Sequence, residues 1–196
     1  MFLENTINHA KQSGWMEVIC GSMFSGKTEE LIRRLRRAEM AGLVVEIFKP
    51  KVDNRYSDED VVSHNQNKIP STAVESTAEI LLLGSNCDVV GIDEAQFFDE
   101  SIVEVANQLA NNGVRVVVAG LDMDFLGRPF GPMPNLMATA EYVTKVHAIC
   151  KRTGNLANYS MRTSSSTDLV ELGETESYEA VSRRVFVDEV LNQDKH

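Results

Sequence analysis

A glycine-rich stretch near the start of the chain constrains the fold more than any other feature. Residues 21–28 read GSMFSGKT, which fits the pattern G-x-x-x-x-G-K-[ST] without a gap. The apolar run before it predicts a buried strand over 16–20, and periodic apolar residues from Thr28 predict an amphipathic helix that stops near Gly42. In this context, unlike in a chance glycine-rich turn, backbone amides and a helix N-terminus meet at one spot. The sequence therefore predicts a loop that holds nucleotide phosphates, with Lys27 at the outer phosphates and Thr28 at Mg²⁺.

Strands and helices alternate over the first part of the chain. Further buried strands are expected in VVEIFK, which ends at Pro50, in DVVGIDEAQFF and in VRVVVAGLD. A helix in AEILLLG follows a capping box of Ser76 and Glu79, and Asp99 caps a helix in ESIVEVANQLANNG. This alternation predicts an α/β fold, a P-loop NTPase core with a mostly parallel sheet covered on both faces. The arginines of the first helix are expected to lie largely away from its apolar face: Arg33, Arg34, Arg36 and Arg37.

The chain changes character after Cys150, where polar residues and the run Ser164–Ser166 replace periodic patterns. We place a boundary near residue 146, with a nucleotide-binding core over 1–145 and a small, partly irregular C-terminal unit over 146–196. The apolar residues of 181–191 either pack on that unit or belong to a frayed terminus.

Charge and cysteine content limit the classes of partner. A formal net charge of −10 argues against a broad nucleic-acid or anionic-membrane surface, although one local pocket can still be positive. The cysteines Cys20, Cys87 and Cys150 lie far apart, so reduced thiols are expected. The N-terminal stretch lacks the basic start of a signal peptide, and no run approaches the about 18 apolar residues of a membrane span. We therefore expect a cytoplasmic protein that binds neither nucleic acid nor membrane.

Two adjacent acids, Asp93 and Glu94, follow the buried strand in VVGIDEAQ. A magnesium–triphosphate site needs an acid at the end of a second buried strand, and Asp93 suits that role through water. Neighbouring side chains diverge at a strand end, so Glu94 is placed to act on the acceptor of a phosphoryl group. The alternative is an exposed acidic strand end without function.

Basic and aromatic residues supply further candidates. Arg55 lies in the long aperiodic stretch 51–68, where it either offsets charge that develops during phosphoryl transfer or is a solvated loop arginine. Phe125 and Phe130 lie in LDMDFLGRPFGP, which Gly and Pro break too often for a core helix. An aromatic wall for a planar base is expected there.

The chain resembles the thymidine kinases of the type found in many bacteria and in the animal cytosolic enzyme. The stretches that carry the resemblance are GSMFSGKTEELIRR, FKPKVDNRYS, VVSHN, IDEAQFFD, VAGLDMDFLGRPFG and ESYE. The resemblance runs from about Gly14 to Glu179. It implies a P-loop core, a small lasso domain that closes over the nucleoside, and a homotetramer. It also implies transfer of the ATP γ-phosphate to the 5′-hydroxyl of deoxythymidine, giving dTMP for nucleotide salvage and DNA precursor synthesis, with dTTP as feedback inhibitor.

The resemblance also assigns roles to individual positions. Glu94 matches the general base, Thr28 and Asp93 match the Mg²⁺ site, and Asp53 and Arg55 match a loop near sugar and phosphates. The positions that match ATP contacts are Gly21, Ser22, Met23, Phe24, Ser25, Gly26, Lys27, Thr28, Asp93, Glu94, Ala95 and Gln96. Those that match the pocket around the base are Met23, Leu121, Phe125 and Phe130, and those that match the lasso over the thymine are Ser160, Leu169, Val170, Glu171, Leu172 and Tyr178.

One departure from the family concerns zinc. These kinases usually tie the lasso with zinc held by two Cys-x-x-Cys pairs, but here only Cys150 is a cysteine. Thr153, Ser182 and Val185 stand at the other three positions. One thiolate cannot make a tetrahedral structural zinc site, so we expect a protein without zinc.

Two other classes of function also use a phosphate loop. A nucleic-acid motor or repair ATPase carries similar strand ends, but it needs a basic channel and a longer chain than 196 residues. A nucleotide-sensing switch would need no base at Glu94. A kinase for another nucleoside would differ only in its base preference.

Overall fold

A six-stranded parallel sheet forms the centre of the molecule. The computed structural model of the chain describes residues 14–51, 60–62, 68–163 and 177–191. The strand order is β5-β2-β6-β7-β1-β8, and every pairing in this sheet is parallel. The parallel α/β core predicted from the alternating pattern is therefore confirmed. The strands are β1 (Trp15–Gly21), β2 (Val45–Pro50), β5 (Thr72–Val74), β6 (Val89–Ile92), β7 (Arg115–Leu121) and β8 (Tyr142–Val146).

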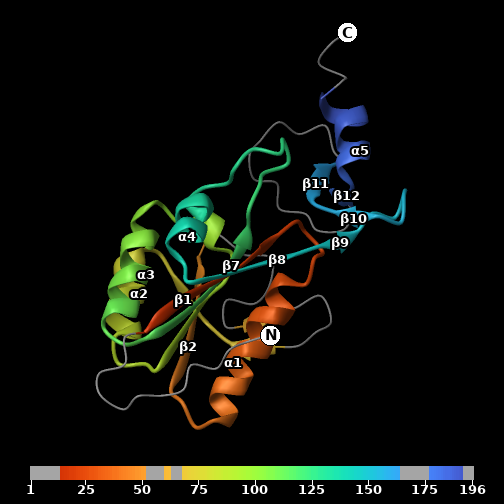
Figure 1. Cartoon of the computed structure of the whole chain (residues 1–196). Coiled ribbons are helices and arrows are strands. Elements are labelled where there is room, and N and C mark those ends of the chain that lie inside the picture. Colours follow the sequence, from red (N-terminus) through yellow and green to blue (C-terminus); the bar gives the residue numbers. More distant parts are fainter. Residues whose placement is uncertain (1–13, 52–59, 63–67, 164–176, 192–196) are drawn as a thin grey trace.

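Helices cover both faces of this sheet (Figure 1). On one face, α1 (Lys27–Met40) buries Leu31 and Leu35 in a cluster with Ile19 of β1. On the other face lie α2 (Thr77–Gly84), α3 (Ser101–Asn111) and α4 (Met133–Thr139), which share a cluster with Val18 and Cys20 of β1. Successive residues of a strand point to opposite faces, so β1 is apolar on both sides.

The expected helix signals are present. Glu79 Oε1 accepts a hydrogen bond from the backbone N–H of Ser76 at 3.0 Å, which completes the capping box of α2. Asp99 Oδ1 accepts from the backbone N–H of Ser101, the first residue of α3, at 2.8 Å. Gly42, with φ of +80°, follows the end of α1 in the left-handed conformation that glycine permits.

Arg34 departs from the prediction for the first helix. Its side chain is 3% exposed and lies under the helix, because Glu17 of β1 is also buried. Glu17 forms ion pairs of 2.7 Å with Arg34 Nη1 and with Arg115 Nε, and Arg34 Nη2 donates to Thr144 Oγ1 at 2.9 Å. The expectation that Arg34 lies away from the apolar face is wrong, since a buried carboxylate on the sheet supplies its partner.

The small strands lie outside the central sheet. β3 (Asp60–Val62) and β4 (Lys68–Pro70) form one antiparallel pair. Near the C-terminus, β9 (Ala148–Ile149) pairs with β10 (Leu156–Ala157), and β11 (Tyr159–Arg162) pairs with β12 (Tyr178–Val181), both antiparallel. The chain continues as α5 (Arg183–Phe186) and a π-helical turn, η2 (Val187–Leu191).

We call β9 to β12, α5 and η2 the C-terminal unit, which carries a hydrophobic cluster of its own. Val181, Val185 and Phe186 are buried in it, and Val190 packs against it. Of the two alternatives for the tail, packing is therefore confirmed as far as Val190. The division of the chain at residue 146 stays a prediction.

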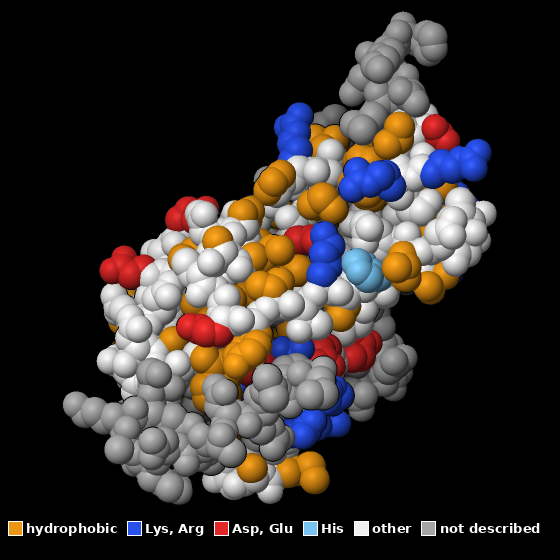
Figure 2. Space-filling view, viewed as in Figure 1, with side chains coloured by type: hydrophobic (Ala, Val, Ile, Leu, Met, Phe, Trp, Pro, Cys, Tyr) orange, Lys and Arg blue, Asp and Glu red, His pale blue; other side chains and the backbone are white. Residues whose placement is uncertain are grey.

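The surface carries mixed charges. On the face shown in Figure 2, the described Lys and Arg side chains form separate small groups rather than one broad basic area. Within the described parts of the chain, none of the helices has the length and apolar character needed to cross a bilayer.

Candidate active site

The phosphate loop connects the carboxyl end of β1 to the first turn of α1, as the sequence predicts. Gly26, at the N-cap of α1, has φ of +85°, and Gly21 has φ of +150°. A Cβ atom on Gly21 would lie 2.2 Å from the carbonyl oxygen of Val146, so only glycine lets β8 approach the loop this closely. Both glycines of the motif thus have a steric reason to be glycine.

Polar side chains hold the loop in a curled conformation. Lys27 Nζ donates to the carbonyl oxygen of Ser22 at 2.8 Å, and Ser25 Oγ donates to the same oxygen at 2.7 Å. Phe24 has a left-handed φ of +61°, which non-glycine residues rarely adopt. The lysine side chain therefore lies along the loop whose amides are expected to cradle phosphates.

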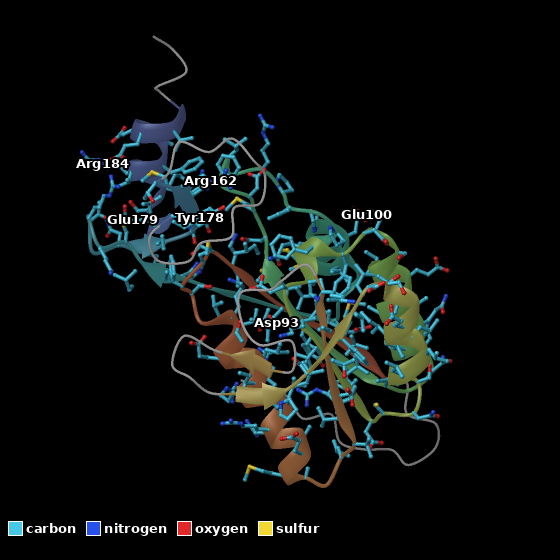
Figure 3. All side chains as sticks on the ribbon, turned by 180° about the vertical axis from the view of Figure 1, so that it is seen from behind. Asp93, Glu100, Arg162, Tyr178, Glu179 and Arg184 are labelled. Atoms are coloured by element: carbon cyan, nitrogen blue, oxygen red, sulfur yellow. The ribbon has the colours of Figure 1, made fainter. Side chains whose placement is uncertain are left out.

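Thr28 and Asp93 bring a hydroxyl and a carboxylate together at the carboxyl edge of the sheet. Thr28 Oγ1 donates to Asp93 Oδ2 at 3.3 Å, and the backbone N–H of Glu94 donates to Asp93 Oδ1 at 3.0 Å. Asp93 directly follows β6 and is 6% exposed (Figure 3). Oxygen donors of these two kinds fit Mg²⁺, so the residues present suit the metal that the family resemblance implies.

The Glu94 side chain turns to a different partner, as expected for neighbours at a strand end. Its Oε2 accepts a hydrogen bond from Gln96 Nε2 at 2.5 Å, and its backbone has a left-handed φ of +51°. Ala95 lies fully buried in the cluster beneath α2 to α4, and Gln96 is 3% exposed. Contacts of Ala95 and Gln96 with ATP stay predictions.

The C-terminal unit touches the phosphate loop directly. The backbone N–H of Met23 donates to Ser160 Oγ at 2.9 Å, and Ser22 Oγ donates to the carbonyl oxygen of Ala157 at 3.2 Å. Phe24 and Met123 pack against the hydrophobic cluster of the C-terminal unit. Two residues predicted near the nucleoside, Met23 and Ser160, are thus brought together.

Arg162 joins two other predicted pocket residues. Its guanidinium carbon lies 3.8 Å from the centroid of the Phe125 ring and 5.2 Å from that of Tyr178, and its Nη2 donates to the Tyr178 hydroxyl at 2.6 Å. Figure 3 shows Arg162 and Tyr178 side by side. Arg162 was not predicted as a pocket residue, because an arginine in a short strand gives no signal of its own.

Two other predicted positions contact other residues, and the rest lie outside the described residues. Phe130 meets Phe97 edge-on, with 5.8 Å between ring centroids, and the backbone N–H of Leu121 donates to Gln96 Oε1 at 2.9 Å. The predicted residues that fall outside the described ranges are Asp53, Arg55, Leu169, Val170, Glu171 and Leu172.

The four positions at which the family resemblance implies zinc ligands lie together, but only Cys150 among them is a cysteine. Thr153 Oγ1 donates to Ser182 Oγ at 3.3 Å, and Val185 and Cys150 are buried in one cluster. Burial raises the pKa of Cys150, but hydrogen bonds from the Thr153 side chain and from backbone groups of Ser182, Arg152 and Thr153 lower it to about 7. Over the described residues, no three His, Cys, Asp or Glu side chains gather in a way that could hold a metal ion. One thiol with two hydroxyls and a valine does not fit structural zinc.

Known proteins resemble the chain over most of its length. A solved structure of the genome packaging NTPase B204 from Sulfolobus turreted icosahedral virus 2 in complex with ATP-gammaS aligns with 13% identity and a TM-score of 0.48, covering 72% of this chain and 79% of that chain. The thymidine kinase of Bacteroides thetaiotaomicron is 58% identical over 187 residues, covering 95% of this chain and 94% of that protein. The thymidine kinase of Porphyromonas gingivalis is 60% identical over 184 residues, covering 94% and 90%. The family model described as thymidine kinase matches residues 14–186, and the chain belongs to the thymidine kinase family.

Proposed function

We propose that this protein transfers the γ-phosphate of ATP to the 5′-hydroxyl of deoxythymidine, giving dTMP and ADP. Membership of the thymidine kinase family supports the choice of reaction. The observation that carries the mechanism is the meeting of Thr28 Oγ1 and Asp93 Oδ2, 3.3 Å apart, beside the phosphate loop, with Glu94 next in the chain. A hydroxyl, a metal-binding carboxylate and a second acid at one strand end are the parts that phosphoryl transfer to an alcohol needs.

The phosphate loop positions ATP and offsets its charge. Backbone amides of residues 21–28 and the N-terminus of α1 bind the phosphates, and Lys27 exchanges its bond to the Ser22 carbonyl for the outer phosphates. Thr28 and Asp93 would hold Mg²⁺, which would supply positive charge at the phosphates of ATP. These groups stabilise charge that builds up on the transferred phosphoryl group.

Glu94 acts as the general base. It takes the proton of the 5′-hydroxyl as the 5′-oxygen forms a bond to the γ-phosphorus, while the bond from that phosphorus to the bridging oxygen breaks and ADP leaves with the electron pair. Asp53 and Arg55 act from their loop near the sugar and the phosphates. The side chain of Asp93 is turned to Thr28, so the two acids serve different partners.

The nucleoside binds between the core, residues 1–145, and a lasso domain, residues 146–196. The Phe125 ring, with β11 and β12 beside it, supplies apolar and stacking surface for a planar base. The proposed base contacts are Met23, Leu121, Phe125, Phe130, Ser160, Leu169, Val170, Glu171, Leu172 and Tyr178.

Finer properties follow from the family resemblance. We propose a cytoplasmic homotetramer that acts in nucleotide salvage, is inhibited by dTTP, and binds neither nucleic acid nor membrane. We also propose that it carries no zinc, because Thr153, Ser182 and Val185 offer no thiolate.

The deciding experiment supplies ATP, Mg²⁺ and each of the four deoxynucleosides, and measures the monophosphate formed. We expect turnover with thymidine, and a loss of about 10² to 10⁴ in kcat for Glu94→Gln with thymidine still bound. Lys27→Ala should instead raise KM for ATP. Nucleotide binding without any monophosphate would favour a nucleotide-sensing switch, and ATP hydrolysis stimulated by nucleic acid would favour a motor.

A further inference from the structure

The side chain of Gln96 is buried and held at both ends. Its Oε1 accepts a hydrogen bond from the backbone N–H of Leu121 at 2.9 Å, and its Nε2 donates to Glu94 Oε2 at 2.5 Å. Gln96 is 3% exposed, so both bonds lie away from bulk water. A buried amide that bonds to both a strand and an acid fixes the position of the acid relative to the strand.

The orientation of this amide follows from its partners. A backbone N–H can only donate, so the oxygen of Gln96 must face Leu121 and the nitrogen must face Glu94. Leu121 is the last residue of β7 and pairs in register with Gly21, the first residue of the phosphate loop. The side chain of Gln96 therefore links Glu94 to the strand end where the proposed ATP site begins.

Two glycines leave room for Gln96. A Cβ atom on Gly120 would lie 2.9 Å from Gln96 Oε1 and 2.6 Å from Met133 Sδ. A Cβ atom on Gly131, whose φ is +47°, would lie 2.4 Å from the carbonyl oxygen of Gln96. The side chain of Gln96 thus occupies space that a larger residue at position 120 would fill, and its backbone occupies space that a larger residue at position 131 would fill.

The backbone of Glu94 also needs external support. Its left-handed φ of +51° is uncommon for a residue with a side chain, and such conformations persist where the surroundings hold them. The short 3₁₀ turn Ala95–Phe97 brings Gln96 back over Glu94. The hydrogen bond between these two side chains is thus part of what holds the acid at the strand end.

We propose that Gln96 is a positioning residue for the general base Glu94, rather than a contact of the ATP phosphates. The proposal rests on the proposed function, in which Glu94 takes the proton of the 5′-hydroxyl. The hydrogen bond from Gln96 Nε2 fixes the direction of the Glu94 carboxylate, on which efficient proton transfer depends.

The test uses Gln96→Glu in the full-length protein. This nearly isosteric change keeps an acceptor for the Leu121 N–H but removes the donor to Glu94. We expect kcat with thymidine to fall about 10²-fold, as for a misplaced reacting group, while KM for ATP changes by less than about twofold.

Gln108→Glu is the matched control. Gln108 is exposed on α3 and also donates to a glutamate, Glu104, at 3.2 Å. It lies on the side of α3 away from the core. Its kcat and its KM for ATP should match those of the unmodified protein. Thermal unfolding of both variants shows whether they are folded. If Gln96→Glu does not fold, Gln96→Met, which adds no charge, replaces it. The same loss of kcat is expected for Gln96→Met.

A double variant separates positioning from other roles. In a Glu94→Gln background, Gln96→Glu should lower the residual rate by less than about threefold, because a residue that acts through Glu94 has nothing left to position. A rise in KM for ATP with unchanged kcat, or a full 10²-fold further loss in the double variant, would overturn the proposal. If Glu94→Gln alone keeps normal turnover, the proposed function fails instead.

Discussion

The backbone N–H of Met23 donates to Ser160 Oγ across 137 positions of sequence, and so joins the phosphate loop to β11. Ser160 is 4% exposed, and Ser22, next to Met23, also bonds to the C-terminal unit, through the carbonyl oxygen of Ala157. The residues proposed to hold ATP and those proposed to cover the nucleoside therefore share hydrogen bonds. These bonds couple the position of the phosphate loop to that of the C-terminal unit.

Ser160→Ala tests this connection. It removes the acceptor of the Met23 N–H, and a lost hydrogen bond of this kind costs about 0.5–1.5 kcal/mol, or roughly 2- to 12-fold in an equilibrium constant. We expect KM to rise for both ATP and thymidine, measured by steady-state kinetics at varied concentrations of each. Ser160→Thr keeps the hydroxyl and should restore both values; a rise for thymidine alone would show that Ser160 touches only the nucleoside.

Thr28→Ala tests the metal site. Loss of the hydroxyl beside Asp93 Oδ2 should raise the Mg²⁺ concentration needed for half-maximal rate by about tenfold, a loss of about 1.4 kcal/mol in metal binding. Thr28→Ser retains the oxygen and is the matched control. Chelation of Mg²⁺ should stop turnover in every variant. An unchanged Mg²⁺ requirement in Thr28→Ala would remove Thr28 from the metal site.

The core was predictable because its signals are local. The pattern of residues 21–28 and the apolar runs around it specify a strand, a loop and a helix, and capping residues such as Ser76 mark helix starts. The short strands β5 and β8 were not predicted, since they owe their conformation to pairing with β2 and β1.

The polar contacts were hidden because they form between distant segments. Arg34 has the pattern of a surface arginine until Glu17 is placed beneath it, and the partner of Gln96 is the backbone of Leu121. Arg162 stacks on Phe125 from another part of the chain. Such pairs depend on the order of strands in the sheet, which no local pattern of apolar residues encodes.

Glu17→Gln tests the buried ion pairs beneath α1. Burial raises the pKa of Glu17, but hydrogen bonds from Arg115 and Trp15 and the charges of Arg115 and Arg34 outweigh it and hold the pKa below its ordinary value of 4.5. Removing one partner of a buried pair leaves the other uncompensated, at a cost of about 3–5 kcal/mol. We expect that loss in the free energy of unfolding, measured by urea titration at neutral pH.

The same ion pairs predict a dependence on pH. A carboxyl whose pKa is lowered on folding contributes stability that is complete above its ordinary value of 4.5 and is lost as the pH falls below it. The difference in stability between the unmodified protein and Glu17→Gln should therefore shrink as the pH is lowered through this region. Glu104→Gln, on the exposed side of α3, should change stability by less than about 0.5 kcal/mol. A constant difference at all pH values would contradict the ion-pair account.

Metal analysis tests the proposed absence of zinc. Cys150, Thr153 and Ser182 lie together, but only one of them offers a thiol. We expect far less than one zinc per chain in purified protein, and a thermal unfolding midpoint that a zinc chelator does not change. About one zinc per chain, lost together with stability on chelation, would show that other residues complete a site.

Cys150→Ala tests what the remaining thiol does. Burial raises the pKa of Cys150, but hydrogen bonds from Thr153 and backbone groups outweigh this and lower the pKa from 9.0 to about 7. Its contribution to stability should thus be complete above pH 9.0 and lost as the pH falls through about 7, so Cys150→Ala should destabilise the protein more at pH 8.5 than at pH 6. Cys20→Ala is the control, because burial and the neighbouring Asp122 raise the pKa of Cys20 to about 11, and its cost should not grow over this range. Equal costs for Cys150→Ala at the two pH values would mean that the thiol stays protonated in the folded protein.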